Sequence, residues 1–230
     1  MKPVTPMTVV YYSTESGACP FDGYLDSLKK DKVTKALILS RIRRVKNGNL
    51  GDCARYGPIT ELRNFQGPGY RIYIGEDGPV LVVLLTAGDK STQPKDLKRR
   101  RSTGMTTKRE KPVVVYSYES IADKHLKDHE VAFLYLQNAL HDDGIEGFMD
   151  ALRDVIRAQG NISQVSKAIG LTRPAVYKIL SKQTNPNFET TEKLLGLLGG
   201  RLGLEKVEPA VKHHPAFRTR TSPSRVKVAA

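Results

Sequence analysis

Cysteine and histidine are scarce in this sequence. Its 230 residues include two cysteines, Cys19 and Cys53, and none of the five histidines lies before His125. One possible disulfide bond excludes a disulfide scaffold, and no secretory signal is recognised, so we expect a soluble, cytoplasmic protein with free thiols. The absence of histidine from residues 1–101 excludes histidine-based general acid–base catalysis by that segment on its own.

Long apolar runs and several common site motifs are also absent. No apolar run reaches the roughly 18 residues that a membrane helix requires, so no membrane partner is predicted. The sequence has no cysteine and histidine spacing typical of a metal site, no phosphate-binding P-loop and no nucleophile elbow. We therefore expect no metal ion and no cofactor. His213 and His214 either bind a metal adventitiously or belong to a disordered tail.

Positive charge is abundant and unevenly placed. The net charge is +13 and the isoelectric point is near 9.7, an excess that favours nucleic acid or another polyanion as a partner. Residues 98–116 carry seven Lys and Arg against one Asp or Glu, and residues 211–230 carry five against none. Residues 117–210 are slightly acidic, with 11 Lys and Arg against 13 Asp and Glu. This distribution indicates two folded parts with a basic linker between them and a basic tail.

The hydrophobic pattern changes along the chain from mixed helices and strands to helices alone. Residues 19–48 contain two stretches with apolar positions three and four residues apart, which predict two helices. The run from Val80 to Leu85 is apolar throughout, so it should form a central strand covered on both faces. The remaining predicted strands are 8–12, 53–57, 59–64 and 70–75, with an extra one at 113–116. The predicted helices are 93–101, 129–143, 145–160, 162–170, 172–181 and 188–202.

Together these elements predict two domains. Residues 1–101 should form an α+β domain, with two N-terminal helices on a small, mainly antiparallel sheet. Residues 102–118 read as a basic linker, residues 119–205 as an all-α domain and residues 206–230 as a disordered basic tail.

Two arginines occupy neighbouring strands of the predicted sheet. If the FQGPG stretch folds the chain into a hairpin, Arg63 and Arg71 lie on one surface near Tyr73. Like charges directly opposite in a sheet repel each other, so these two either lie on a solvated face or await a polyanion. Arginine and lysine can orient a scissile phosphate and stabilise a developing phosphorane, and tyrosine or a lysine of lowered pKa can transfer protons. The loop after the central strand can add Asp89, Lys90 and Gln93.

These motifs resemble those of a known toxin superfamily. The strings GNLGD, ELR, GPGYRIY and LLTAGDKSTQ, within about residues 7–101, are similar to the RelE superfamily and, within it, to HigB-like addiction-module killer proteins. The resemblance implies a small α/β ribonuclease that cuts mRNA in the ribosomal A site. It implies catalytic or phosphate-clamping roles for Arg63, Arg71, Lys90 and Gln93. The RNA-binding candidates that go with it are Arg43, Lys46, Arg55 and Tyr73.

A second constellation lies in the stretch SQVSKAIGLTRPAVYKILS. With Gly170 as the turn, Val165, Ile169, Leu171, Val176 and Ile179 fall at spacings that bury two crossed helices. Thr172 is a suitable N-cap for the second helix, with Pro174 in its first turn. This spacing predicts a helix-turn-helix whose second helix enters the DNA major groove, although generic helix packing gives a similar pattern. The candidate DNA-binding residues are Gln164, Thr172, Arg173, Tyr177 and Lys178.

Residues 105–204 resemble a second family, the HigA-like addiction-module antidote proteins. The resemblance rests on YLQNAL, GFMDALRDVIRAQG, GLTRPAVYKILS and NPNFETTEKLLGLLGGRL. It implies a repressor that binds its own operator DNA and also wraps the toxin, and paired half-sites make a homodimer the expected form. Residues 113–140 are the candidate inhibitory contact, because Asp123, Asp128 and Glu130 could pair with cations of the first part. A solvated acidic helix is the alternative.

Two functions fit these patterns. In the first, one chain holds a type II toxin–antitoxin module, in which a ribosome-dependent mRNA endonuclease is neutralised by a DNA-binding antitoxin that represses its own operon. The linker would hold the inhibitor at an effective concentration of order millimolar. In the second, the chain is a transcription regulator whose toxin-like half is catalytically dead and serves dimerisation or partner binding. The retained Arg63, Arg71 and Lys90 favour the first. A natural fusion and two reading frames joined for expression would look the same.

Overall fold

The first part of the chain combines strands with two helices, and helices dominate the second part. The computed structural model describes residues 6–11, 13–14, 16–57, 59–63, 70–77, 81–89 and 116–203. The elements of the first part are β1 (Thr8–Tyr11), α1 (Pro20–Ser27), α2 (Lys32–Lys46), β2 (Cys53–Tyr56), β3 (Ile59–Arg63), β4 (Tyr70–Asp77) and β5 (Leu81–Asp89). Those of the second are β6 (Tyr116–Ser117), α4 (Tyr118–Leu126), α5 (His129–Ala158), α6 (Ile162–Ile169), α7 (Arg173–Leu180) and α8 (Phe188–Leu197). The predicted α+β region followed by a helical region is confirmed.

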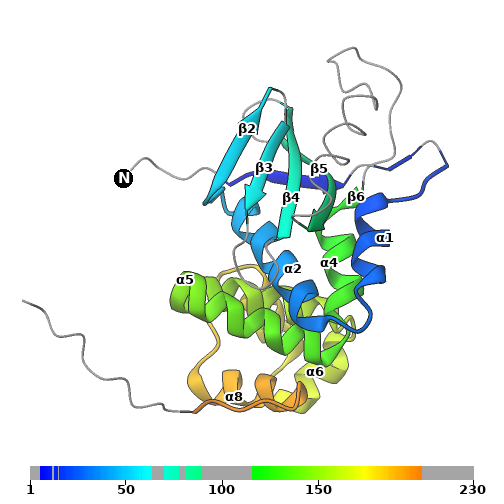
Figure 1. The fold of residues 1–230 in the computed structure, drawn as a ribbon. Helices are drawn as coiled ribbons and strands as arrows, with labels where there is room; N and C mark the ends of the chain where they lie inside the picture. Colours follow the sequence, from blue (N-terminus) through cyan, green and yellow to red (C-terminus); the bar gives the residue numbers. More distant parts are fainter. Residues whose placement is uncertain are drawn as a thin grey trace, which may run out of the picture.

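The six strands form one sheet in the order β2-β3-β4-β5-β1-β6. β1 and β5 run parallel and the other neighbouring strands run antiparallel, so the sheet is mainly antiparallel, as predicted. β5 lies between β4 and β1, which confirms the predicted central position of this strand. Its predicted cover on both faces stays a prediction. β6 pairs with β1 and so adds the start of the second part to the sheet of the first (Figure 1).

α2 lies beneath the sheet, and local sequence sets both of its ends. The carboxylate of Asp31 caps its start by accepting a hydrogen bond from the Thr34 amide at 3.0 Å. Ile38 and Ile42, four positions apart, are completely buried on its apolar side. After the helix ends, Gly48 adopts a φ of +82°, which a residue with a β-carbon rarely does. The predicted stop at the Asn-Gly pair is therefore confirmed.

α5 consists of two helices that meet at a single residue. Gly144 has a φ of +65° and a ψ of −157°, outside the helical region, so two helices meet there. This backbone conformation is open almost only to glycine. The structure thus agrees with the prediction of separate helices at 129–143 and 145–160.

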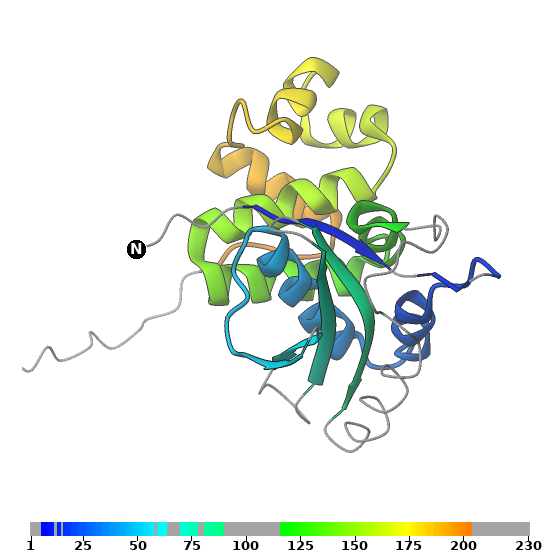
Figure 2. The same cartoon turned by 90° about the horizontal axis from the view of Figure 1, so that it is seen from above.

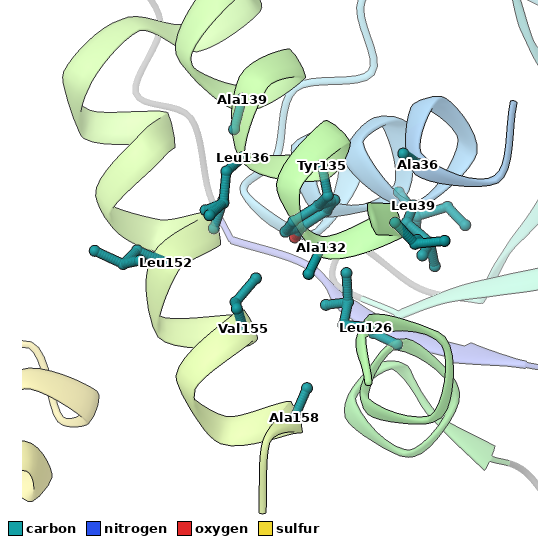
Figure 3. Close-up of a cluster of buried hydrophobic side chains, with 14 of the residues drawn as sticks. Ala36, Leu39, Leu126, Ala132, Tyr135, Leu136, Ala139, Leu152, Val155 and Ala158 are labelled. Atoms are coloured by element: carbon teal, nitrogen blue, oxygen red, sulfur yellow. The ribbon is translucent and has the colours of Figure 1, made fainter. Parts of the chain in front are cut away.

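The sheet, α2, α5 and the last three helices lie in successive layers (Figures 1 and 2). One continuous hydrophobic cluster joins Leu62 and Ile72 of the sheet, Ala36 and Leu39 of α2, and Tyr135 of α5. Figure 3 shows Tyr135 beside the two α2 residues, where the first and second parts meet. The two parts of the chain therefore share a hydrophobic core.

The described residues of the second part start at Tyr116. Tyr116 and Ser117 form β6 and α4 starts at Tyr118, inside the predicted linker at 102–118. The hydroxyl of Ser117 caps α4 by accepting a hydrogen bond from the Ser120 amide at 3.2 Å. The rest of that linker, the predicted helix at 93–101 and the predicted tail at 206–230 lie outside the described residues.

Two further sequence predictions concern membrane helices and cysteines. Within the described ranges, no helix is long and apolar enough to cross a membrane. Cys19 and Cys53 are both half-buried free thiols. Burial raises the pKa of the Cys19 thiol, although hydrogen bonds from two backbone amides oppose the shift. The neutral thiol is therefore the expected state of Cys19 near neutral pH.

Candidate functional site

Arg63 and Arg71 lie directly opposite each other in the β3–β4 ladder, as the hairpin prediction requires. The carboxylate of Glu61 lies between them and accepts a hydrogen bond from Arg63 Nε at 3.0 Å and another from Arg71. Glu61 is completely buried, whereas the Arg63 side chain is 34% exposed. The hydrogen bond with Glu61, followed by one with Tyr56, raises the pKa of Arg63. Because one carboxylate faces two guanidinium groups, the cluster keeps a positive charge that reaches solvent through Arg63.

The register of β2, β3 and β4 decides which other side chains join this arginine pair. Residues opposite one another in an antiparallel ladder share a face, and the faces alternate along each strand. Tyr73 is opposite Glu61 and therefore lies on the arginine face, but it is completely buried. Arg55 is opposite Thr60 and so lies on the other face of the sheet. The structure therefore does not bring Arg55 to the arginine pair.

Glu61 and Tyr56 complete the arginine face but are not among the sequence-predicted site residues. Tyr56 is 38% exposed and interacts with Arg63. It is opposite Ile59, two residues before Glu61, so alternation places it on the same face. Applying that alternation to the CARY strand would have identified Tyr56. The burial of Glu61 has no such local signal, because it depends on what covers the sheet.

Two of the predicted catalytic residues follow β5. Lys90 and Gln93 lie outside the described residues, so their roles stay predictions. In the ladder between β4 and β5, Gly88 is opposite Arg71 and Asp89 is opposite Tyr70. The chain therefore leaves β5 next to the end of β4 that carries Arg71.

The predicted RNA contacts Arg43 and Lys46 lie in α2 and are bonded to the second part of the chain. Arg43 is 1% exposed, and its guanidinium group donates to the Asp143 carboxylate at 2.7 Å and to the Gly147 carbonyl at 2.9 Å. Lys46 pairs with Glu119 at 2.6 Å. Because α2 packs against the opposite face of the sheet, these cations lie away from the arginine face.

The predicted acidic contact between the two parts is confirmed for two of its three residues. Lys32 of α2 pairs with Asp128 at 3.0 Å and with Glu130 at 2.8 Å. The prediction for Asp123 is wrong, because this carboxylate pairs with Arg157 of α5 at 2.8 Å. Successive residues of a helix point about 100° apart. Lys124 therefore faces α1, where it forms an ion pair with Asp22, while Asp123 faces α5.

Asp22, Asp26 and His125 gather where α1 meets α4, close enough together to hold a metal ion. However, the ammonium group of Lys124 lies 2.7 Å from Asp22 and 2.8 Å from Asp26. His125 Nε2 is 2.8 Å from Asp22, and burial lowers the pKa of this histidine. The cluster joins the two parts of the chain through its own ion pairs, and we assign no metal to it.

α6 and α7 form the helix pair predicted around Gly170. This glycine ends α6 with a φ of +72°, and Thr172 caps α7 by accepting a hydrogen bond from the Ala175 amide at 3.4 Å. Pro174 lies in the first turn of α7. The predicted apolar contacts that are buried here are Val165, Ile169, Val176 and Ile179.

All five predicted DNA-binding residues lie on the outside of this helix pair. Gln164, Thr172, Arg173, Tyr177 and Lys178 are exposed, and the Tyr177 side chain is 57% exposed. Arg173 is hydrogen-bonded to the Ser163 hydroxyl of α6. A ligand approaching α7 could therefore reach all five side chains without unfolding the pair.

Residues 117–206 match the family model described as "Probable addiction module antidote protein". An uncharacterized protein of Haemophilus influenzae is 46% identical over 82 residues, which is 35% of this chain and 82% of that protein. Residues 117–206 are therefore similar to addiction module antidote proteins. A second uncharacterized protein of the same organism is 40% identical over 75 residues, which is 33% of this chain and 76% of that protein. No solved structure matches the chain.

We call residues 117–206 the antidote segment. It contains α4 to α8, and therefore both the exposed helix pair and the carboxylates that pair with cations of α2. Its α4 and α5 pack against the first part of the chain, and its α6 and α7 leave the five candidate DNA-binding residues exposed. The antidote segment thus has one face against the first part and another open to a further partner.

Proposed function

We propose that this chain is a type II toxin–antitoxin module in one polypeptide, with a ribonuclease toxin at residues 1–101 and an antitoxin in the antidote segment. One observation carries the proposal. The antidote segment is bonded through Asp143 and Glu119 to Arg43 and Lys46, two cations that RNA-binding by the first part would use. An antidote needs a toxin, and in this chain the antidote segment packs against the first part.

Arg63 and Arg71 are the proposed phosphate clamp of the toxin. Cleavage would form a bond from the ribose 2′-oxygen to phosphorus, with the 2′-hydroxyl proton passing to water, and break the bond to the 5′-oxygen, which leaves with a proton. Guanidinium groups stabilise the extra negative charge of the phosphorane between these two events. Glu61 cannot reach RNA because it is completely buried, so its role is to position the two arginines. Lys90 would supply the proton to the leaving oxygen, and mRNA on the ribosome is the proposed substrate.

The antidote segment is also the proposed repressor. α7 would enter the major groove of operator DNA, with Arg173 reading a guanine edge and Lys178 contacting phosphate. A homodimer would place two such helices on paired half-sites. Replacing Arg173 by Ala should weaken binding to the DNA upstream of the gene by about 1–3 kcal/mol, measured by fluorescence anisotropy with a scrambled DNA duplex as control. Equal affinity of both proteins for the upstream DNA would exclude Arg173 as a reader.

Bacterial growth tests the toxin. Residues 1–101, the full chain and the fragment carrying Arg63→Ala/Arg71→Ala are induced separately. We expect arrest by the unchanged fragment only, because the full chain is held by its antidote segment and the double change removes the phosphate clamp. Immunoblotting of the soluble fraction must show equal amounts of both fragments. Normal growth with soluble, unchanged fragment would exclude an active toxin.

One observation favours the alternative function, a transcription regulator with an inactive first part. The two parts share a hydrophobic core, so the first part also stabilises the antidote segment whatever its chemistry. In that case the full chain should bind upstream DNA while the fragment leaves growth unchanged.

A further inference from the structure

The C-terminal end of α7 is held by one buried side chain of α5. Arg153 is 8% exposed, and its guanidinium group donates hydrogen bonds to three partners. Nε donates to the Ile179 carbonyl in the last turn of α7 at 2.8 Å, and Nη2 donates to Asn185, which follows that helix, at 2.6 Å. Nη1 donates to Asp150, one turn earlier in α5, at 3.0 Å. We call the side chains of Asp150, Arg153 and Asn185 the α7 anchor.

The end of a helix favours a cation at this place. The last carbonyl groups of a helix lack a partner within the helix and carry partial negative charge. Arg153 meets one of them with a planar, permanently charged group whose donors point in fixed directions. A lysine ammonium is a single point of charge, so it cannot match acceptors spread around a guanidinium plane. The α7 anchor therefore depends on arginine itself and not on positive charge alone.

The residue that follows the α7 C-cap supports the same anchor. Lys182 has a φ of +60°, a left-handed conformation that glycine usually adopts after a helix. Glycine would relieve the backbone but lose an ion pair, because the Lys182 ammonium lies 2.8 Å from the Asp150 carboxylate. Asp150 also accepts a hydrogen bond from the Asn47 side chain at the end of α2, at 3.2 Å. The α7 anchor thus lies where the antidote segment meets the first part.

Two candidate DNA-binding residues lie next to this anchor in the sequence. Tyr177 and Lys178 are exposed and directly precede Ile179, whose carbonyl Arg153 binds. α7 has eight residues, so it is about 12 Å long, and Arg173 lies at its other end. A tilt at the C-terminal end of α7 would therefore move Lys178 while Arg173 stayed almost in place.

We propose that Arg153 is a positioning residue for DNA binding, which fixes the tilt of α7 so that Arg173 and Lys178 reach a base edge and a phosphate together. Binding groups must be held within about 0.5 Å of their productive positions by the residues behind them. Arg153 is buried behind α7, so it acts through that helix and not by touching DNA. This inference rests on the proposed DNA-binding role of the antidote segment.

The test uses the full chain and the DNA duplex from upstream of the gene, with a scrambled duplex as the reference. Arg153→Lys keeps the charge and loses the planar fork. The matched control is Arg157→Lys in the same helix. Arg157 also pairs with the aspartate three residues before it, at 2.8 Å, but its second carboxylate partner is Asp123 of α4 and not a residue near α7.

Lys178→Ala is then added to the unchanged chain and to both variants, and DNA affinity is measured by fluorescence anisotropy over a range of salt concentrations. Loss of one phosphate contact reduces the log–log slope by about 0.9. We expect Lys178→Ala to cause this loss in the unchanged chain and in Arg157→Lys. In Arg153→Lys the loss should be much smaller, because Lys178 no longer reaches the phosphate. A merely structural Arg153 would leave the loss equal in all three proteins, and that result would overturn the inference.

Hydrogen exchange without DNA tests the α7 anchor independently. Amides of residues 173–181 should exchange faster in Arg153→Lys than in Arg157→Lys, because only the first change loosens the end of α7. Equal exchange rates in the two variants would overturn the inference. If Arg153→Lys does not fold, Asn185→Ala takes its place, since it removes one acceptor of Arg153 without changing the net charge.

These measurements separate the inference from the repressor proposal. An unchanged chain that binds the upstream and scrambled duplexes equally would disprove the repressor and, with it, the role of Arg153 in DNA binding. Preference for the upstream duplex, together with the full Lys178→Ala loss in Arg153→Lys, would leave the repressor in place and disprove the positioning role.

Discussion

Glu61→Gln tests whether the buried carboxylate holds the arginine pair together. The amide keeps the shape of the side chain but loses its charge, so two charge-assisted hydrogen bonds become neutral ones. A hydrogen bond to a charged group contributes about 1.5–3 kcal/mol and a neutral one about 0.5–1.5 kcal/mol. Solvent screens the bond to Arg63, which is 34% exposed, whereas Arg71 is more buried. We expect the free energy of unfolding to fall by about 1–3 kcal/mol.

The assay is urea denaturation of the full chain, followed by circular dichroism, with thermal melting alongside. For a chain of this size, each 1 kcal/mol lowers the melting temperature by about 2–4 °C. Glu189→Gln is the matched control, because its exposed ion pair with Lys193 should leave stability unchanged. Adding Arg71→Met to Glu61→Gln should recover part of the loss, since the two cations then no longer face each other. The same midpoint for Glu61→Gln and the unchanged protein, or full additivity in the double variant, would refute the reasoning.

Three further predictions concern local structure. Gly51→Ala should lower the free energy of unfolding by about 1–3 kcal/mol in the same assay, because Gly51 has a φ of +53° and the new β-carbon would lie 2.3 Å from an Arg41 nitrogen. An unchanged free energy of unfolding would show that the loop adapts. Burial lowers the pKa of His125, so the unfolded chain binds more protons than the folded chain at mildly acidic pH. The free energy of unfolding should therefore decrease as the pH falls below about 6.5, and His125→Gln should lose this part of the pH dependence. Thr172→Ala should cost about 1 kcal/mol as the loss of the α7 cap, whereas Thr172→Ser should not.

Much of this protein could be predicted from local sequence. The period-two runs around FQGPG predict the hairpin, and its register does place Arg63 opposite Arg71. Gly170 and Thr172 mark the end of one helix and the start of the next, because a left-handed backbone and an N-cap each need particular residue types. Such features depend on residues a few positions apart, so the order of the amino acids determines them.

The partners of the charged groups depend on how distant elements pack. From the sequence alone we expect Asp123 to pair with a cation of the first part, but the orientation of α4 places its carboxylate beside Arg157 of α5. Arg43 is a plausible RNA contact in sequence, yet packing of α5 on α2 buries it against Asp143. In the sequence, Glu61 is an ordinary polar residue of a predicted strand. In the folded sheet, it is buried and hydrogen-bonded to two arginines. Local periodicity thus determined the elements, whereas burial and ion pairing, which join residues as much as 102 positions apart, were decided only by the tertiary structure.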